Sequence, residues 1–248
     1  MLLKVPIDIV PPEELPGVIE HLLTDTVPSS PSERVKGRDI VLLSLWDLLR
    51  ARRNGEYRDY VFNAALVIPI SKSLVSGARF LTGKKVARYM PFNFVIGLLS
   101  ILEKREYPLY LLGSRSRVLK RAERNIHSTF PRLRIVGRRE GHIRKQEEPA
   151  VMEAIRKASP SLLLAGRGMR GGERWIARNS DRLNSGFRLW CSDLFDVFAE
   201  KKRRPSDAVF DMGLECIGYC LRNPFKILRI FPYFRYKFLL LFYRLFRR

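Results

Sequence analysis

The chain has 248 residues, a length that fits one domain with an appendage or two small domains. Hydrophobic residues make up 46% of it, which is enough for a packed core and excludes a globally disordered chain. The formal charge is +21, and the eight Lys and Arg residues after Glu215 leave +13 for the remainder. Such a charge indicates an anionic partner, whether nucleic acid, a membrane surface or a phosphorylated substrate.

Cysteine usage and the N-terminus indicate the compartment. Cys191, Cys216 and Cys220 form no CxxC pair, so they predict neither a zinc site nor a disulfide framework. A reducing, cytoplasmic environment is the simplest interpretation. The first eight residues lack a basic segment followed by a long apolar one, which argues against a secretory signal. The sequence implies no metal ion and no bound cofactor.

The N-terminal segment is expected to precede the main domain. Residues 5–9 read as a short strand, and Pro11-Pro12-Glu13-Glu14 then opens a helix through Leu23, with acidic residues in its first turn. Residues 26–32 are a Pro- and Ser-rich linker.

From residue 39 onward, short apolar strands alternate with helices. The predicted strands are residues 40–45, 64–70, 109–112, 133–136, 162–165 and 187–191. The predicted helices are residues 47–53, 114–127, 147–158 and 173–179, and residues 89–102 are expected to form a buried loop and helix. This alternation predicts a doubly wound, mostly parallel, Rossmann-like α/β sheet with helices on both faces.

We therefore expect three segments along the chain. Residues 1–38 form an N-terminal strand, helix and linker, residues 39–205 the Rossmann-like domain, and residues 206–248 a basic C-terminal appendage. In a doubly wound sheet, ligands bind at the carboxyl ends of strands, near a reversal of strand order.

Two strand ends carry glycine where a phosphate group can approach the backbone. Gly113 leads directly into a predicted helix, and residues 166–172 hold four glycines and two arginines between a strand and a helix. Backbone N–H groups in such turns bind anions, although neither segment matches the Walker or the dinucleotide fingerprint. An ordinary flexible turn is favoured for Gly113 alone, and an anion site for the turn containing Gly166 and Gly168.

Few carboxylates are available for acid or base chemistry. Asp193 and Asp196 flank Phe195 after a predicted strand, and Glu173 opens a helix beside the glycine-rich turn. Asp196 and Glu173 are the candidate catalytic residues. The alternative for Asp196 is a helix N-cap. No Ser/His/Asp or Cys/His set is apparent.

The C-terminal segment joins aromatic and aliphatic residues to positive charge only. No acidic residue follows Glu215, and no uncharged run there is longer than that of residues 238–243, which is far short of the roughly 20 residues that cross a bilayer. Such a segment is typical of one that lies among lipid headgroups; a helix docked on its own protein is the alternative. The residues expected at the membrane are Arg222, Lys226, Arg229, Phe231, Tyr233, Phe234, Arg235, Lys237, Phe238, Phe242, Arg244, Arg247 and Arg248.

Motifs along nearly the whole chain resemble one family. They are Val5-Pro6-Ile7-Asp8 with Glu13-Glu14, Gly83 and Arg88, Leu111-Leu112-Gly113, Phe130-Pro131, Ile135-Val136-Gly137 with Gly141, Gly166 and Gly168 with Glu173, Trp175, Ile176 and Asn179, Phe195-Asp196, Arg204, Gly213-Leu214-Glu215 and Asn223-Pro224. Together they resemble the WecG/TagA/CpsF glycosyltransferases of bacteria. The most specific of them is the glycine turn followed by Glu-x-Trp-Ile.

This resemblance implies a function. Such enzymes transfer an N-acetylhexosamine from a UDP-sugar to a polyprenyl-pyrophosphate-linked acceptor, at the inner face of the cytoplasmic membrane, in cell-surface polysaccharide synthesis. It implies that the nucleotide sugar is bordered by Gly113, Gly166, Gly168, Glu173 and Arg88, and the acceptor pyrophosphate by Arg204. The implied partners are the nucleotide sugar, the lipid-linked acceptor and an anionic membrane surface, and a homo-oligomer is left open.

Several polar positions depart from the family pattern. The presumed catalytic aspartate falls at Ile70 or Ser71, and neither is a carboxylate. Other departures are Leu42 and Ser44, Pro91-Phe92-Asn93, Gly172 and Cys216. A member that binds nucleotide sugar or lipid-linked glycan, or scaffolds a partner, without turnover is therefore the alternative. A nucleic-acid-binding protein is disfavoured because few aromatic residues interleave with the basic stretches of the body.

Overall fold

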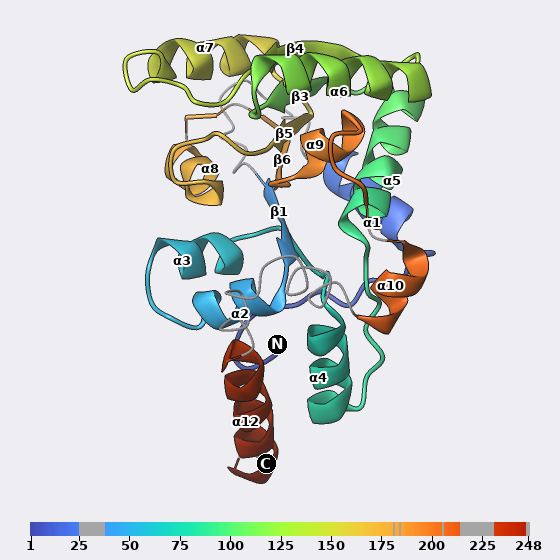
Figure 1. Ribbon diagram of the computed structural model, residues 1–248, viewed down its shortest axis with the longest axis vertical. Coiled ribbons are helices and arrows are strands. Elements are labelled where there is room, and N and C mark those ends of the chain that lie inside the picture. Colours follow the sequence, from blue (N-terminus) through green and yellow to red (C-terminus); the bar gives the residue numbers. More distant parts are fainter. Residues whose placement is uncertain (25–37, 181, 184, 205, 214–230, 247–248) are drawn as a thin grey trace. The chain divides into compact units, whose positions relative to one another are not determined.

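The computed structural model describes residues 1–24, 38–180, 182–183, 185–204, 206–213 and 231–246 (Figure 1). In chain order its elements are α1 (Leu15–Thr24), β1 (Arg38–Leu43), α2 (Leu45–Ala51), α3 (Glu56–Phe62), β2 (Leu66–Pro69), α4 (Lys72–Thr82), α5 (Pro91–Lys104), β3 (Leu109–Leu112), α6 (Ser116–Thr129), β4 (Ile135–Arg139), α7 (Glu148–Ala158), β5 (Leu162–Ala165), α8 (Glu173–Asn179), β6 (Phe187–Trp190), α9 (Leu194–Phe198), α10 (Asp207–Met212) and α12 (Phe231–Phe246). The predicted linker at residues 26–32 lies outside the described residues.

The described strands form one six-stranded sheet with the order β2-β1-β6-β5-β3-β4. The pairs β1–β6, β6–β5, β5–β3 and β3–β4 are all parallel. The prediction of a doubly wound parallel α/β fold is therefore confirmed. Strands β3 and β5 are buried along their whole length, which explains their unbroken apolar sequences.

The chain divides into two compact units whose sequences interleave. The first unit comprises residues 1–11, 42–90 and 204–248, and the second unit comprises residues 12–41 and 91–203. The predicted division at residues 38 and 205 remains a prediction.

In the second unit, helices lie on both sides of the strands. Figure 1 shows α7 and α8 on one side and α5, α6 and α9 on the other. For α6, α7 and α8 this placement is the one that right-handed crossovers require. The connection from β3 to β4 through α6 runs toward the β4 edge of the sheet, whereas the connections from β4 to β5 through α7 and from β5 to β6 through α8 run in the opposite direction.

A buried ion pair joins two neighbouring strands of the second unit. Asp39 on β1 and Arg188 on β6 are cross-strand partners, only 6% and 1% exposed. The Arg188 guanidinium donates Nε to Asp39 Oδ1 at 2.7 Å and Nη2 to Oδ2 at 2.9 Å, and its Nη1 donates to the Ser180 carbonyl at 2.9 Å. Burial raises the pKa of Asp39, and Arg188 partly offsets this.

In the first unit, Asp8 forms hydrogen bonds to the backbone of β2. The Asp8 N–H donates to the Val67 carbonyl at 3.0 Å, and the Asp8 carboxylate accepts the Val67 N–H at 2.6 Å. The predicted strand at residues 5–9 is wrong: only an isolated bridge between Leu2 and Val5 forms there. Pro6 has no N–H to offer a ladder, and the Asp8 side chain makes the contact that a strand backbone would make.

Several other predicted boundaries also shift. Helix α1 begins at Leu15 rather than at Pro11, and β4 begins at Ile135 rather than at residue 133. The sequence interpretation missed α3, α4, α9 and α10, which are short or interrupted by glycine. The helix within residues 89–102 is confirmed as α5, whose buried residues include Phe94, Leu98 and Leu102.

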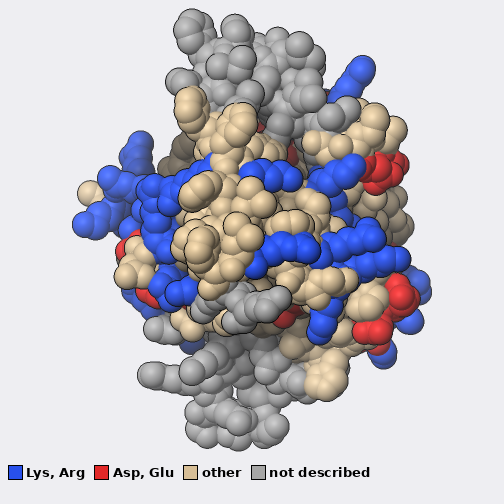
Figure 2. All heavy atoms as spheres, turned by 90° about the horizontal axis from the view of Figure 1, so that it is seen from below, with Lys and Arg blue, Asp and Glu red and all other residues tan. Residues whose placement is uncertain are grey.

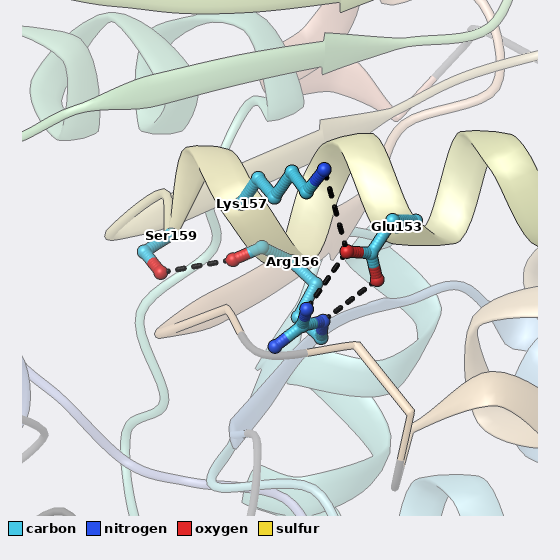
Figure 3. A network of polar contacts seen from close by, with 4 residues as sticks. All are labelled: Glu153, Arg156, Lys157 and Ser159. Atoms are coloured by element: carbon cyan, nitrogen blue, oxygen red, sulfur yellow. Dashed lines mark hydrogen bonds and ion pairs between the residues drawn. The ribbon is translucent and has the colours of Figure 1, made fainter.

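We predict that Asp39→Ala lowers the free energy of unfolding by about 3–5 kcal/mol, because it leaves the buried Arg188 guanidinium without its counter-charge. Glu153→Ala is the matched control: Glu153 pairs with Arg156 in a similar two-bond arrangement at 2.7 and 2.8 Å, but on the exposed surface of α7, where Lys157 is also within 3.8 Å (Figure 3). Urea denaturation followed by circular dichroism measures both. Equal losses for the two variants would contradict the role given to the buried pair.

Candidate functional site

The winding of the second unit reverses between β3 and β5. These strands are neighbours, yet β3 continues into α6 and β5 continues into α8, on opposite sides of the sheet (Figure 1). In a doubly wound sheet the carboxyl ends at such a reversal are the usual ligand-binding position. Gly113 directly follows β3 and Gly166 directly follows β5, so the structure brings these two predicted residues to this position.

The two loops touch through their backbones. A Cβ on Gly113, whose φ is +119°, would lie 2.7 Å from the Gly166 carbonyl oxygen. The Gly113 N–H donates to the Arg139 carbonyl at 2.9 Å, and the Gly166 N–H donates to the Leu112 carbonyl at 2.8 Å. Glycine is therefore required here for close packing of the loops.

A third loop, after β4, joins this contact. A Cβ on Gly141 would lie 2.7 Å from the Arg167 carbonyl oxygen and 2.8 Å from the Gly168 Cα. The His142 N–H donates to the Gly168 carbonyl at 2.6 Å, and the Gly141 N–H donates to the Ser114 carbonyl at 2.8 Å. Three glycine-containing loops thus form one hydrogen-bonded layer at the carboxyl edge. The role of Gly113, Gly166 and Gly168 in binding a nucleotide sugar remains a prediction.

Charged side chains lie beside this layer. The Asp193 carboxylate, after β6, forms ion pairs with Arg167 from the loop after β5 and with Lys202. The sequence predicted an anion site in the glycine-rich turn that contains Arg167 and named Asp193 among the few carboxylates, but it did not bring these two residues together with Lys202. The available signal was Arg167 itself, an arginine between two glycines immediately after a strand.

The two candidate catalytic carboxylates belong to short helices of the second unit. Glu173 is the first residue of α8 and is half-buried. Asp196 lies in the first turn of α9, with its side chain 15% exposed and 3.6 Å from Lys201 Nζ. The N-cap alternative for Asp196 is wrong, because Asp193 occupies the cap position. Catalysis by Glu173 or Asp196 remains a prediction.

Trp175, one of the residues of the family motif, forms a hydrogen bond that connects two helices. Its indole N–H donates to the Glu148 carboxylate at the start of α7, and it is 4% exposed. Asn179 Nδ2 donates to the Trp175 carbonyl at 2.9 Å. The Trp175–Glu148 bond holds α8, and with it Glu173, against α7, whereas the Asn179 bond lies within α8.

In the first unit, the end of β2 carries no acid. The Ile70 N–H donates to the Leu43 carbonyl at 3.0 Å. Ser71 precedes α4, and its Oγ is buried with no hydrogen-bond partner among the described residues. At the position where the resemblance places an aspartate, the chain therefore presents an aliphatic side chain and a hydroxyl.

Arg88 lies at the same strand end. Its Nε donates to the Ile70 carbonyl at 3.0 Å, its Nη1 donates to the Phe210 carbonyl, and its guanidinium carbon is 3.6 Å from the centre of the Phe210 ring. Arg88 thus connects the end of β2 to α10. Arg204 is exposed. The phosphate contacts assigned to Arg88 and Arg204 remain predictions.

One face of α12 packs on the first unit. Tyr236 is fully buried, its hydroxyl donates to the Ser73 carbonyl at 2.8 Å, and a Cβ on Gly77 of α4 would clash with that hydroxyl. Burial raises the pKa of the Tyr236 phenol. Arg244 Nη1 donates to the Phe80 carbonyl at 3.0 Å, and its guanidinium lies over the Phe80 ring. The alternative of a helix docked on its own protein therefore describes one side of α12.

The other face of α12 is apolar and exposed. Phe231, Phe234 and Phe238 are about 70% exposed, at 70%, 70% and 69%. The further large apolar residues on this face are Leu241, Phe242, Leu245 and Phe246. Arg235 and Lys237 are exposed on the same helix. Figure 2, which views the molecule from below, shows Lys and Arg side chains around and among uncharged side chains, with acidic residues toward the margins of the view.

Five of the residues predicted at the membrane, Arg222, Lys226, Arg229, Arg247 and Arg248, lie outside the described residues. Within the described ranges, no helix has the length and apolar character needed to cross a bilayer. In the same part of the chain, no group of three His, Cys, Asp or Glu side chains gathers as a metal site.

Burial raises the pKa of the Cys191 thiol to about 12.

Together the sheet, its strand order and the glycine layer define a doubly wound α/β protein with its loops gathered at the carboxyl edge. All 248 residues match the model of the glycosyl transferase WecG/TagA/CpsF family. The chain belongs to this family, as the motifs indicated.

Two relatives carry the same name, N-acetylglucosaminyldiphosphoundecaprenol N-acetyl-beta-D-mannosaminyltransferase. The relative from Bacillus subtilis (strain 168) is 21% identical over 176 residues, which are 71% of this chain and 68% of the relative. The relative from Bacillus spizizenii (strain ATCC 23059 / NRRL B-14472 / W23) is 20% identical over 211 residues, 85% of this chain and 79% of the relative.

We predict that Gly77→Leu releases α12, because the new side chain occupies the space of the Tyr236 hydroxyl. Hydrogen exchange over residues 231–246 should accelerate. Gly97→Leu on α5 is the control, since no atom lies within 4 Å of the position that a Cβ would take there. Unchanged exchange in the Gly77 variant would show that α12 does not depend on this contact.

Proposed function

We propose that the protein is a glycosyltransferase that moves an N-acetylhexosamine from a UDP-sugar to a polyprenyl-diphosphate-linked acceptor in cell-surface polysaccharide synthesis. The observation that carries the proposal is the family match over the whole chain, with two relatives whose shared name describes such a transfer to an undecaprenyl-diphosphate-linked acceptor. The doubly wound sheet supports it, because its carboxyl edge is where nucleotides bind in such folds.

In the proposed reaction an acceptor hydroxyl attacks the anomeric carbon of the donor sugar. A new C–O bond forms, the bond from the sugar to the diphosphate breaks, and UDP leaves with the bonding electrons. The hydroxyl proton passes to a base, for which Asp196 and Glu173 are the candidates, and a placed carboxylate contributes about 10²–10⁴-fold. Arg88 and Arg204 are proposed to neutralise diphosphate charge.

A second candidate is binding of the nucleotide sugar or the lipid-linked glycan without turnover. It is favoured by the strand end at Ile70 and Ser71, where no carboxylate stands. The two candidates share the ligand and differ only in whether a proton acceptor is in place.

We predict turnover with at least one UDP-N-acetylhexosamine and a polyprenyl-diphosphate-linked N-acetylglucosamine acceptor, measured as UDP release and product formation. Of Asp196→Asn and Glu173→Gln, the variant that removes the base should lower kcat by about 10²–10⁴-fold with little change in KM. Glu153→Gln, an exposed isosteric change on α7, is the control.

The result separates the candidates. UDP binding by calorimetry without any turnover would replace the first candidate by the second. Neither binding nor turnover across the donor panel would overturn both.

We further propose that the exposed face of α12 holds the protein on anionic lipid, near its acceptor. The supporting observation is the combination of Phe231, Phe234 and Phe238 at about 70% exposure with cations on the same helix and no acidic residue on it. Aromatic side chains on such a face enter the headgroup boundary while Arg and Lys meet lipid phosphates.

We predict that the double variant Phe234→Ser and Phe238→Ser binds anionic phosphatidylglycerol vesicles at least about tenfold more weakly, since each phenylalanine loses apolar burial. Vesicle sedimentation measures this, and raised salt should weaken wild-type binding as well. Val136→Ser, at an exposed apolar residue of β4, is the control. Wild-type protein that ignores these vesicles would contradict the proposed surface.

A further inference from the structure

We propose that Arg167 is a diphosphate-binding residue, held in place by Asp193 and supported by Lys202. None of the three is among the residues that the resemblance assigned to a ligand. The inference rests on the proposed function, because its ligand is the nucleoside diphosphate part of the donor.

The main chain of Arg167 is fixed at the carboxyl edge. Arg167 follows Gly166 directly after β5, its N–H donates to the Ser192 carbonyl at 3.2 Å, and its carbonyl accepts the Ser114 N–H. Both flanking residues, Gly166 and Gly168, lack side chains. The Arg167 side chain therefore leaves the glycine layer from a fixed base beside the reversal between β3 and β5.

Four main-chain donors at the start of the two loops are already used by the protein itself. The N–H groups of Gly113, Ser114, Gly166 and Arg167 all donate to carbonyls of the protein. A phosphate group would have to displace these bonds in order to use them. At these four positions an anion is therefore better bound by a neighbouring side chain than by the backbone.

The charges beside the layer suit a phosphate. Asp193, with its side chain 24% exposed, is shared between Arg167 Nη2 and Lys202 Nζ, so the three residues together carry one net positive charge. The Arg167 side chain is 62% exposed. Among the described residues its guanidinium has this one ion pair, which leaves further N–H donors of the planar fork for a second acceptor. Arginine binds phosphate oxygens in this two-donor manner.

A plain surface ion pair between Arg167 and Asp193 is the competing explanation. Such a pair contributes little to stability and would leave ligand binding unchanged. Arg167 is the second residue beyond a buried strand and lies inside a layer of three loops under either explanation. A measurement of ligand binding separates the two.

The test is calorimetric titration of the whole protein with UDP. Arg167→Ala should weaken UDP binding by about 10- to 100-fold, the loss expected for hydrogen bonds to a charged group, and should reduce its salt dependence. Arg167→Lys keeps the charge without the fork and should fall between the two. Arg156→Ala is the matched control: it removes the same charge from an exposed ion pair on α7 (Figure 3). Thermal midpoints of all variants check that they are folded.

The outcomes distinguish this inference from the function on which it rests. A loss confined to the Arg167 variants supports the inference. UDP binding that is equal in wild type, Arg167→Ala and Arg156→Ala overturns the inference and leaves the proposed function standing. Wild-type protein that binds no UDP overturns both.

Discussion

The contact of three loop backbones at the carboxyl edge determines which residues the loops of the second unit can carry. A Cβ on Gly113 or on Gly141 would lie only 2.7 Å from a carbonyl oxygen of the neighbouring loop, so a side chain at either position would force the loops apart. The same contact uses N–H groups that a glycine-rich turn would otherwise offer to an anion. The Arg167 side chain borders the layer, and Gly166 and Gly168 on either side of it carry no side chain.

Much of the fold could be predicted from the sequence, because apolar runs of four residues ending in glycine leave few alternatives to buried parallel strands. Helix α4 could not. Its sequence contains Gly77 in the interior, which disfavours a helix by about 1 kcal/mol relative to alanine. The reason for a glycine at this position is the Tyr236 side chain, which occupies the space that a Cβ would need. The strand predicted at residues 5–9 was wrong for a similar reason: the Asp8 carboxylate replaces a ladder bond, which no hydrophobic pattern reveals.

The candidate site was only partly accessible to the same reasoning. Gly113 and Gly166 could be placed, since strand ends in a parallel sheet meet at one edge. The same limit applies to the buried ion pair of the sheet. Asp39 and Arg188 are 149 residues apart, and their pairing depends on strand order and register, which the sequence does not state. The Asp193 cluster likewise needs three loops in place before Arg167 and Lys202 share one carboxylate.

The seating of α12 has a consequence for how the protein is made. The Tyr236 hydroxyl bonds a carbonyl 163 residues earlier in the chain, so α4 leaves the ribosome long before its covering helix exists. Until then the surface of α4 around Gly77 lacks the helix that covers it in the folded protein. Docking of α12 therefore comes after α4 and the strands that follow it have been made. It buries Tyr236 against α4 and leaves Phe231, Phe234 and Phe238 exposed on the opposite face of the helix.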